Sequence, residues 1–188
     1  HSSIIRACQE MGIRANIGIC FMNNLGEKTI EENFEFARQF SKTNNGIIDI
    51  SIAPHAIYTC DSQLYKKCYE FAKENNLYFH THLSETQKEV EDSIKQYGMR
   101  PVEYLNKIGV LDEKTLLAHC VHLSEQEAEI ISKTKSIIVH NPCSNMKLAS
   151  GIFDSRQAKK YNCNIALGTD GCSSNNNLSM IEEMKIAS

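Results

Sequence analysis

The chain has 188 residues, of which 41% are hydrophobic and 23% are charged, and its formal net charge is −3. This balance is typical of a soluble globular protein and argues against disorder. The 20 Lys and Arg are spread among 23 Asp and Glu with no basic run, which argues against a nucleic-acid partner. No apolar stretch approaches the roughly 18 residues of a membrane helix, so we expect no membrane partner.

The chain begins with neither Met nor a basic-then-apolar signal pattern, which predicts a start inside a longer protein. Its eight cysteines are scattered without a CxxC pair, and several lie in apolar runs, where a reduced Cys behaves as a small hydrophobe. We therefore predict reduced thiols and a cytoplasmic location.

Short apolar runs that end in polar residues recur along the chain and predict buried strands. These runs cover residues 13–21, 47–55, 77–83, 115–122, 136–142 and 164–170.

Helix signals lie between the predicted strands. Capping boxes are predicted at Thr29–Glu32 and Ser124–Glu127, and Gly98 and Gly109 are predicted to end helices. The Ser and Asn residues of 173–177 are predicted to cap the last helix.

The alternation of strand and helix predicts an α/β fold, and the strands start about 30 residues apart, as in a (β/α)8 barrel. A doubly wound open sheet is the rival, but no Gly-rich phosphate loop follows any strand. We predict one domain, residues 1–188, that forms six of the eight units of a TIM-type barrel. Its outer strands, 13–21 and 164–170, should then have open edges that a second copy or a complementing barrel segment covers.

Six of the seven histidines lie at or near the ends of predicted strands: His55, His80, His82, His119, His122 and His140. In a parallel barrel these ends form one rim, on which active sites are built. Asp170 follows the last strand and adds a carboxylate to the same rim. Because His and Asp are the ligands that zinc prefers, the pattern predicts a metal site.

The segment HTHLSET carries the strongest signal. His80 and His82 point to the same side of a strand, and we predict that His82, nearer the rim, is the ligand while His80 is a buried core residue. Glu85 lies just beyond the strand and could carry a proton. The alternative, that HTH is a paired-ligand motif opening the barrel, leaves too few strands before it and too many polar strand ends after it.

The other histidines receive weaker assignments. His119 is predicted to polarise a metal-bound water or a substrate carbonyl, and His122 to cap the following turn. His55, which follows Pro54, suits a substrate contact, whereas His140 is predicted to hold its loop.

Six motifs in order, APHAIYTC, HTHLSET, YGMRPVEYL, AHCVH, VHNPCSNMKL and LGTDGCSSNNNLSMIEEM, resemble the amidohydrolase superfamily. Within it they are most similar to the 5-methylthioadenosine/S-adenosylhomocysteine deaminase group. The resemblance runs from about residue 4 to the end of the chain. It implies a metal-bearing (β/α)8 barrel, flanked by a small β-sandwich, that deaminates an adenine base hydrolytically.

The resemblance also implies roles for individual residues. His82 matches a metal ligand, Asp170 a ligand and general base, and Glu85 the proton donor that contacts the purine ring. His119 matches the residue that hydrogen-bonds the metal-bound hydroxide, and His55 matches a substrate contact. The implied cofactor is one divalent metal, with zinc as the leading candidate and iron, manganese or nickel as alternatives, and a truncated chain can lack it.

Two departures from the family pattern leave questions open. The first-strand HxH that supplies two further ligands has no counterpart before residue 13, and the sandwich segments are missing, so this chain alone can be inactive. Family members that act on S-adenosylhomocysteine are expected to use Arg near the third strand's end, where residues 19–32 offer only Lys28. We therefore expect a substrate with an uncharged tail.

The leading expectation is a metal-dependent deaminase of a small-molecule adenine nucleoside, of the methylthioadenosine or S-adenosylhomocysteine type. The first alternative is an amidohydrolase that acts on another heterocycle of the guanine, cytosine or triazine type. The second is a non-catalytic barrel fragment that serves as a binding module.

Overall fold

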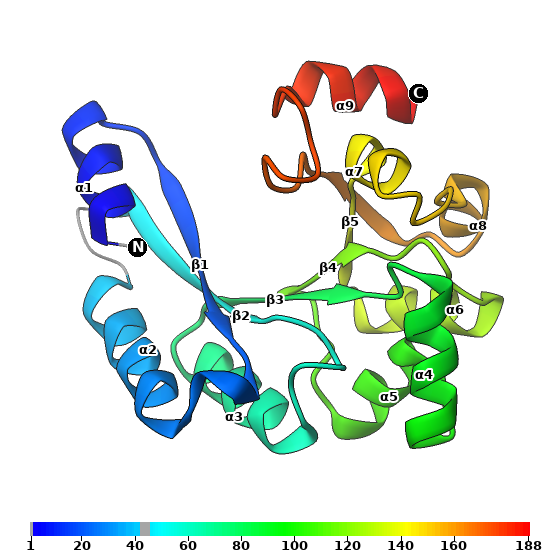
Figure 1. Ribbon diagram of the computed structural model, residues 1–188, viewed down its shortest axis with the longest axis horizontal. Helices are drawn as coiled ribbons and strands as arrows, with labels where there is room; N and C mark the ends of the chain where they lie inside the picture. The colour runs from blue at the N-terminus through cyan, green and yellow to red at the C-terminus, as the bar shows by residue number, and fades with distance from the viewer. Residues whose placement is uncertain (1, 42–45) are drawn as a thin grey trace. The chain divides into compact units, whose positions relative to one another are not determined.

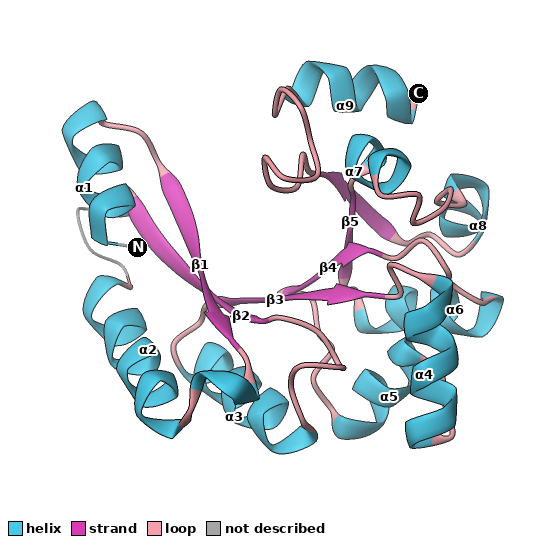
Figure 2. Ribbon diagram, in the orientation of Figure 1, coloured by secondary structure: helices cyan, strands magenta, loops and turns pink. Residues whose placement is uncertain are grey.

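Each strand is followed by one or more helices in the computed structural model, which describes residues 2–41 and 46–188 (Figures 1 and 2). Within these ranges the strands form a sheet in chain order, β1-β2-β3-β4-β5-β6, and the registered pairs are parallel. Two compact units divide the chain, His1–Thr81 and His82–Ser188, and each is described by itself. The prediction that 1–188 is a single domain stays a prediction.

The first unit is built around two long parallel strands. Its elements are α1 (Ser2–Met11), β1 (Ala15–Phe21), the short 3-10 helix η1 (Asn23–Leu25), α2 (Glu27–Phe40), β2 (Ile48–Pro54), α3 (Ser62–Glu74) and most of β3 (Tyr78–Leu83). β1 and β2 pair along their whole length, from Ala15 opposite Ile48 to Phe21 opposite Pro54. Helices α1 and α2 pack on both strands, and α3 packs on β2.

The core of the first unit follows from its apolar pattern. Phe34 of α2 packs on Phe21 of β1 with ring centroids 4.5 Å apart. The helical stripe of Ile30, Phe34 and Ala37 is buried. Burial alternates along β1, where Ile17, Ile19 and Phe21 are buried, whereas β2 has a continuous buried run at residues 50–52.

The second unit starts with the last two residues of β3. Its elements are α4 (Gln87–Tyr97), α5 (Pro101–Ile108), β4 (Thr115–His119), α6 (Glu125–Thr134), β5 (Ile137–His140), α7 (Pro142–Lys147), α8 (Ser155–Lys160), β6 (Asn164–Leu167) and α9 (Met180–Ala187). β5 pairs in parallel with both β4 and β6. β6 is an outer strand of the described sheet, as predicted, and three of its four side chains are exposed.

Several predicted helix boundaries are confirmed. The Ser124–Glu127 capping box begins α6, with both of its reciprocal hydrogen bonds present. Gly98 and Gly109 end α4 and α5 in the left-handed conformation, which glycine adopts at low cost.

Two predicted helix starts are wrong. Helix α2 begins at Glu27, because Gly26 turns the chain there with φ 79° and no side-chain cap, so the Thr29–Glu32 capping box does not form. Helix α9 begins at Met180 and is capped by Ser179 rather than by 173–177. In that segment Ser174 donates to Asp170, and the Asn175 amide donates to the side chain of Glu183 in the first turn of α9 without capping it.

The later strands are shorter than predicted because the backbone leaves the extended region early. β4 ends at His119, and both His119 and Cys120 have positive φ, 73° and 50°. All eight cysteines are free thiols in the structure. No helix within the described ranges has the length and apolar character needed to cross a membrane.

Candidate active site

Three side chains from different strand ends of the second unit converge. His82 lies in β3, His119 is the last residue of β4, and Asp170 lies three residues beyond β6. One ring nitrogen from each histidine and one carboxylate oxygen of Asp170 all lie within 4.8 Å of one another. The two imidazoles are stacked, with ring centroids 5.5 Å apart. These residues form a group that can hold a metal ion.

The backbone is strained at this convergence. His119 and Asp170 have φ 73° and 60°, in the left-handed region that residues other than glycine rarely adopt. Cys120 adopts φ 50° and donates its N–H to the carbonyl of Leu83, 2.9 Å away, which ties the end of β4 to that of β3. Such conformations cost of order 1–3 kcal/mol each and persist where the surrounding structure enforces them, often at functional sites.

One nitrogen of the His119 ring is hydrogen-bonded, and the other lies near the carboxylate of Glu85. Its side chain is 2% exposed, and Nδ1 lies 2.9 Å from Oδ1 of Asn145, so Nδ1–H donates to the amide oxygen. The opposite nitrogen, Nε2, lies 3.7 Å from Oε2 of Glu85. With the proton on Nδ1, Nε2 keeps its lone pair and can bind a metal or accept a hydrogen bond.

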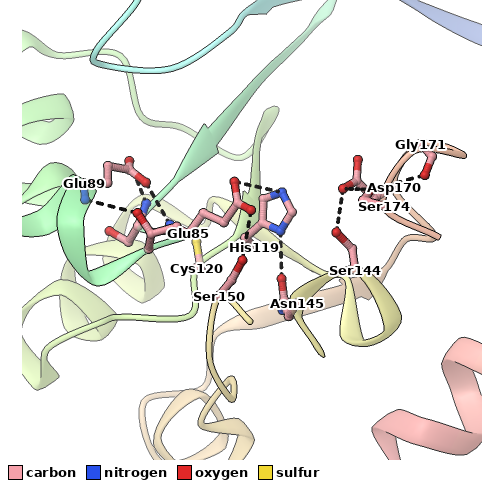
Figure 3. A network of polar contacts seen from close by, with 12 residues as sticks. Glu85, Glu89, His119, Cys120, Ser144, Asn145, Ser150, Asp170, Gly171 and Ser174 are labelled. Atoms are coloured by element: carbon pink, nitrogen blue, oxygen red, sulfur yellow. Dashed lines mark hydrogen bonds and ion pairs between the residues drawn. The ribbon is translucent and has the colours of Figure 1, made fainter. Parts of the chain in front are cut away.

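The Asp170 carboxylate is held by two hydroxyls. Ser144 and Ser174 both donate to Oδ2, at 2.7 and 2.6 Å (Figure 3). Burial raises the pKa of this carboxyl, but the hydrogen bonds from Ser174, Ser144 and the backbone of Gly171, with a smaller effect of His119, outweigh burial and lower the pKa below its ordinary value. Asp170 is therefore ionised at neutral pH, as a metal ligand must be.

Glu85 is fixed at its backbone and at its carboxylate. The N–H groups of Ser84 and Glu85 donate to the two carboxylate oxygens of Glu89, at 2.9 and 2.8 Å. Ser150 donates its hydroxyl to Oε1 of Glu85 at 3.1 Å, which leaves Oε2 toward His119 (Figure 3). Burial raises the pKa of the Glu89 carboxyl despite the backbone hydrogen bonds it accepts.

The remaining predicted residues have other surroundings. His55, in the first unit, directly follows β2, and its Nδ1 lies 2.9 Å from the hydroxyl of Thr59. His80 is half-buried rather than fully buried. His122 does not cap the following turn, since Ser124 caps α6 and the His122 Nε2 instead bonds the carbonyl of Ser150 at 2.6 Å.

His140 lies outside the metal-holding group and packs its ring on Phe153, with centroids 4.7 Å apart. Its backbone carbonyl accepts the N–H of Gly168 at 2.9 Å, which continues the pairing of β5 with β6, and the loop-holding role of the side chain stays a prediction. Nδ1 of this ring is buried and has no hydrogen-bond partner among the described residues. Burial lowers the pKa of the His140 imidazole.

Sequence analysis missed three residues of the site. Ser144, Asn145 and Ser150 follow β5 and contact Asp170, His119 and Glu85 respectively. They lie in or just after the VHNPCSNMKL motif, whose small polar residues directly after a strand end were the available signal.

Known proteins with similar sequences identify the family. The sequence profile described as "Amidohydrolase family" matches residues 2–188. The chain belongs to the amidohydrolase family. A 5'-deoxyadenosine deaminase of Methanopyrus kandleri is 44% identical over 98% of the chain and 44% of its own length. A 5-methylthioadenosine/S-adenosylhomocysteine deaminase of Thermoanaerobacter pseudethanolicus is also 44% identical, with the same coverage. The resemblance inferred from the six motifs is thus confirmed.

A solved structure supports the same family at the level of the fold. The amidohydrolase chain superposes on an adenosine deaminase from Xanthomonas campestris with bound zinc, with a TM-score of 0.85 and 30% identity over 96% of the chain and 42% of that protein. The predicted fold class, an α/β partial TIM-type barrel of the metal-dependent hydrolase type, is confirmed. The chain spans less than half the length of these relatives.

Proposed function

We propose that the protein containing this chain is a metal-dependent deaminase that hydrolyses the amino group from the adenine base of a nucleoside. The observation that carries this proposal is the convergence of His82, His119 and Asp170 within 4.8 Å, with Glu85 beside His119. The names of the two sequence relatives, deaminases of 5'-deoxyadenosine and of methylthioadenosine or S-adenosylhomocysteine, support the substrate class.

The donor set fits a divalent ion of borderline softness. Two imidazole nitrogens and one carboxylate oxygen are typical zinc ligands, and the Nδ1 hydrogen bond of His119 leaves Nε2 available for binding. Zinc is the proposed ion, as in the Xanthomonas campestris structure. When bound, such an ion lowers the pKa of a coordinated water to about 7, so that a nucleophile forms at neutral pH.

The side chains of the chain divide the proton transfers between them. Asp170 is ionised and can accept a proton from the attacking water. Glu85 delivers a proton to the ring nitrogen next to the carbon under attack. Water adds to that carbon, and Asp170 passes the accepted proton to the amino group, which leaves as ammonia. The added hydroxyl gives its proton back to Glu85 as a carbonyl replaces the amino group on the base.

The substrate tail is proposed to be uncharged. Lys28, the cation available near the end of β1, is 91% exposed at its side chain and lies 3.8 Å from Glu32. A carboxylate tail without a paired cation would be costly to desolvate, whereas 5'-deoxyadenosine and methylthioadenosine have none. His55 is proposed to contact the substrate. The cytoplasmic location and an oligomeric or complementing partner stay predictions.

Kinetics with the full-length protein test the proposed function. We expect ammonia release from 5'-deoxyadenosine and methylthioadenosine with higher kcat/KM than from S-adenosylhomocysteine. Replacing Glu85 with Gln should lower kcat by about 10²–10⁴-fold, the usual contribution of a positioned general acid. Turnover of guanine or a triazine with none of adenine nucleosides would contradict the proposal.

A further inference from the structure

One short segment after β5 contacts each of three reacting side chains. We propose that Ser144, Asn145 and Ser150 are positioning residues, which we call the positioning triad, and that each orients a different member of the site. This inference rests on the proposed function for the roles of the residues that are oriented. Figure 3 shows the three contacts, each of which joins residues that are 26 to 65 positions apart in the sequence.

Burial indicates that the triad serves the site rather than the surface. Ser144, Asn145 and Ser150 are 0%, 1% and 6% exposed. A buried polar side chain is costly unless it is hydrogen-bonded, and the hydroxyls of both serines and the amide oxygen of Asn145 direct their bonds to Asp170, Glu85 and His119. The triad therefore stabilises the orientation of these three groups.

Asn145 gives the strongest case. Its Oδ1 accepts from Nδ1 of His119, but its Nδ2 is buried without a hydrogen-bond partner among the described residues. An unpaired buried N–H is costly, so the amide bears a penalty while it holds His119. The consequence is that the His119 proton stays on Nδ1, and Nε2 keeps the lone pair with which His119 can join His82 and Asp170 around an ion.

The triad is itself held in place by the backbone around it. The N–H of Ser150 donates to the carbonyl of Asn145 at 2.9 Å, and the carbonyl of Ser150 lies 2.6 Å from Nε2 of His122. Gly151 has φ 131°, and a Cβ there would lie 2.8 Å from Val121, so the turn depends on glycine. Arg100 in turn donates to the carbonyl of His122 at 2.6 Å.

The three residues of the positioning triad contact groups with different roles, so their replacement should have different effects. Asn145 and Ser144 contact metal-facing residues, although Ser174 also holds Asp170 and should mask part of the loss of Ser144. Ser150 contacts Glu85, which is outside the metal-holding group. Loss of Asn145 should therefore weaken metal binding, whereas loss of Ser150 should slow turnover without weakening it.

The test measures zinc affinity, by competition with a chromogenic chelator, and kcat and KM for methylthioadenosine in the full-length protein. Asn145→Ala should weaken zinc binding by about 10–100-fold, as loss of an outer hydrogen-bond partner does, and Asn145→Asp, which keeps the acceptor, should restore most of it. Ser150→Ala should lower kcat by about tenfold, with KM and zinc affinity within about twofold of wild type, because it misplaces a proton donor. Ser150→Thr should recover much of kcat.

Ser136→Ala is the matched control. Ser136 is fully buried at the opposite end of β5, and its hydroxyl donates to the carbonyl of Asp112 at 3.0 Å, so its replacement removes a buried hydroxyl without touching the site. Wild-type zinc affinity in Asn145→Ala, or equal losses of kcat in Ser150→Ala and Ser136→Ala, would overturn the proposal. If adenine nucleosides are not turned over, the proposed function fails alone: the zinc affinities still decide for Asn145, and the Glu85 carboxylate position in crystals of Ser150→Ala decides for Ser150.

Discussion

At the scale of single residues, the site depends on which hydrogen bond each polar side chain makes. His119, His122 and His140 all lie at or just beyond the ends of apolar strands, yet their rings have different partners: Asn145, a backbone carbonyl and Phe153. Only His119 combines deep burial with a nitrogen directed at another histidine and a carboxylate. The chemistry of a histidine here is therefore decided by the partner of its second nitrogen.

His140 leads to a prediction about pH. Burial lowers the pKa of its imidazole, with a smaller lowering effect of His119 and an opposing effect of Glu183. The unfolded chain, with a histidine pKa of about 6.5, then binds this proton at higher pH than the folded chain. The contribution of His140 to stability is complete above about pH 6.5 and is lost as the pH falls through the lowered, folded-state pKa.

We therefore expect the unfolding free energy of His140→Gln to fall less than that of the wild type as the pH is lowered from 6.5. Urea unfolding of the metal-free protein at several pH values, for wild type and variant, measures this difference. Parallel pH profiles for the two proteins would show that His140 is not responsible.

At the scale of elements, a buried carboxylate joins the N-terminal ends of α5 and α6 in the second unit. Glu127, fully buried near the start of α6, accepts from Nε of Arg100 at 2.6 Å and from the N–H groups of Val102 and Ser124 at 3.1 and 2.9 Å. One carboxylate thus ties the first turn of α5 to the cap of α6. The same Arg100 reaches His122 and through it the turn that carries Ser150.

Glu127→Ala is expected to be strongly destabilising, by about 3–5 kcal/mol, because it leaves Arg100 and two backbone N–H groups without their acceptor. Lys133→Ala, which breaks an exposed pair with Glu129 in the same helix, should cost less than about 1 kcal/mol. Denaturant unfolding of both variants measures the contrast. Similar losses in the two variants would contradict the assigned role of Glu127.

At the scale of the whole molecule, the three candidate ligands all belong to the unit His82–Ser188. They come from three strand ends separated by helices, so an ion that binds them joins segments that are distant in sequence. A ligand that binds only the folded state stabilises that state by mass action.

Zinc at about 100 times its dissociation constant should therefore raise the unfolding free energy of the metal-stripped full-length protein by about 2.7 kcal/mol. Hydrogen exchange should show the largest gain in protection in peptides that cover 82–85, 118–122 and 168–174. Replacement of His82 with Ala should abolish that gain. Protection that rises only outside these peptides would place the ion elsewhere.

The sequence by itself determined the strand-helix alternation and the residues that gather at the strand ends. Both depend on local patterns: apolar runs form buried strands, and the carboxyl ends of parallel strands share one edge, so the pattern alone placed His82, His119 and Asp170 at that edge together with four other histidines. The six motifs, taken in order, were enough to indicate the family.

Only the tertiary structure decided which side chains hold the reacting groups. The contact of Ser150 with Glu85 spans 65 residues and that of Asn145 with His119 spans 26, and neither follows from a periodic pattern. Local signals also failed where the backbone overrode them, as at Gly26, whose positive φ starts α2 before the expected cap. The physical reason is that such hydrogen bonds depend on how loops return to the site, and that path is set by packing over the whole unit rather than by neighbouring residues.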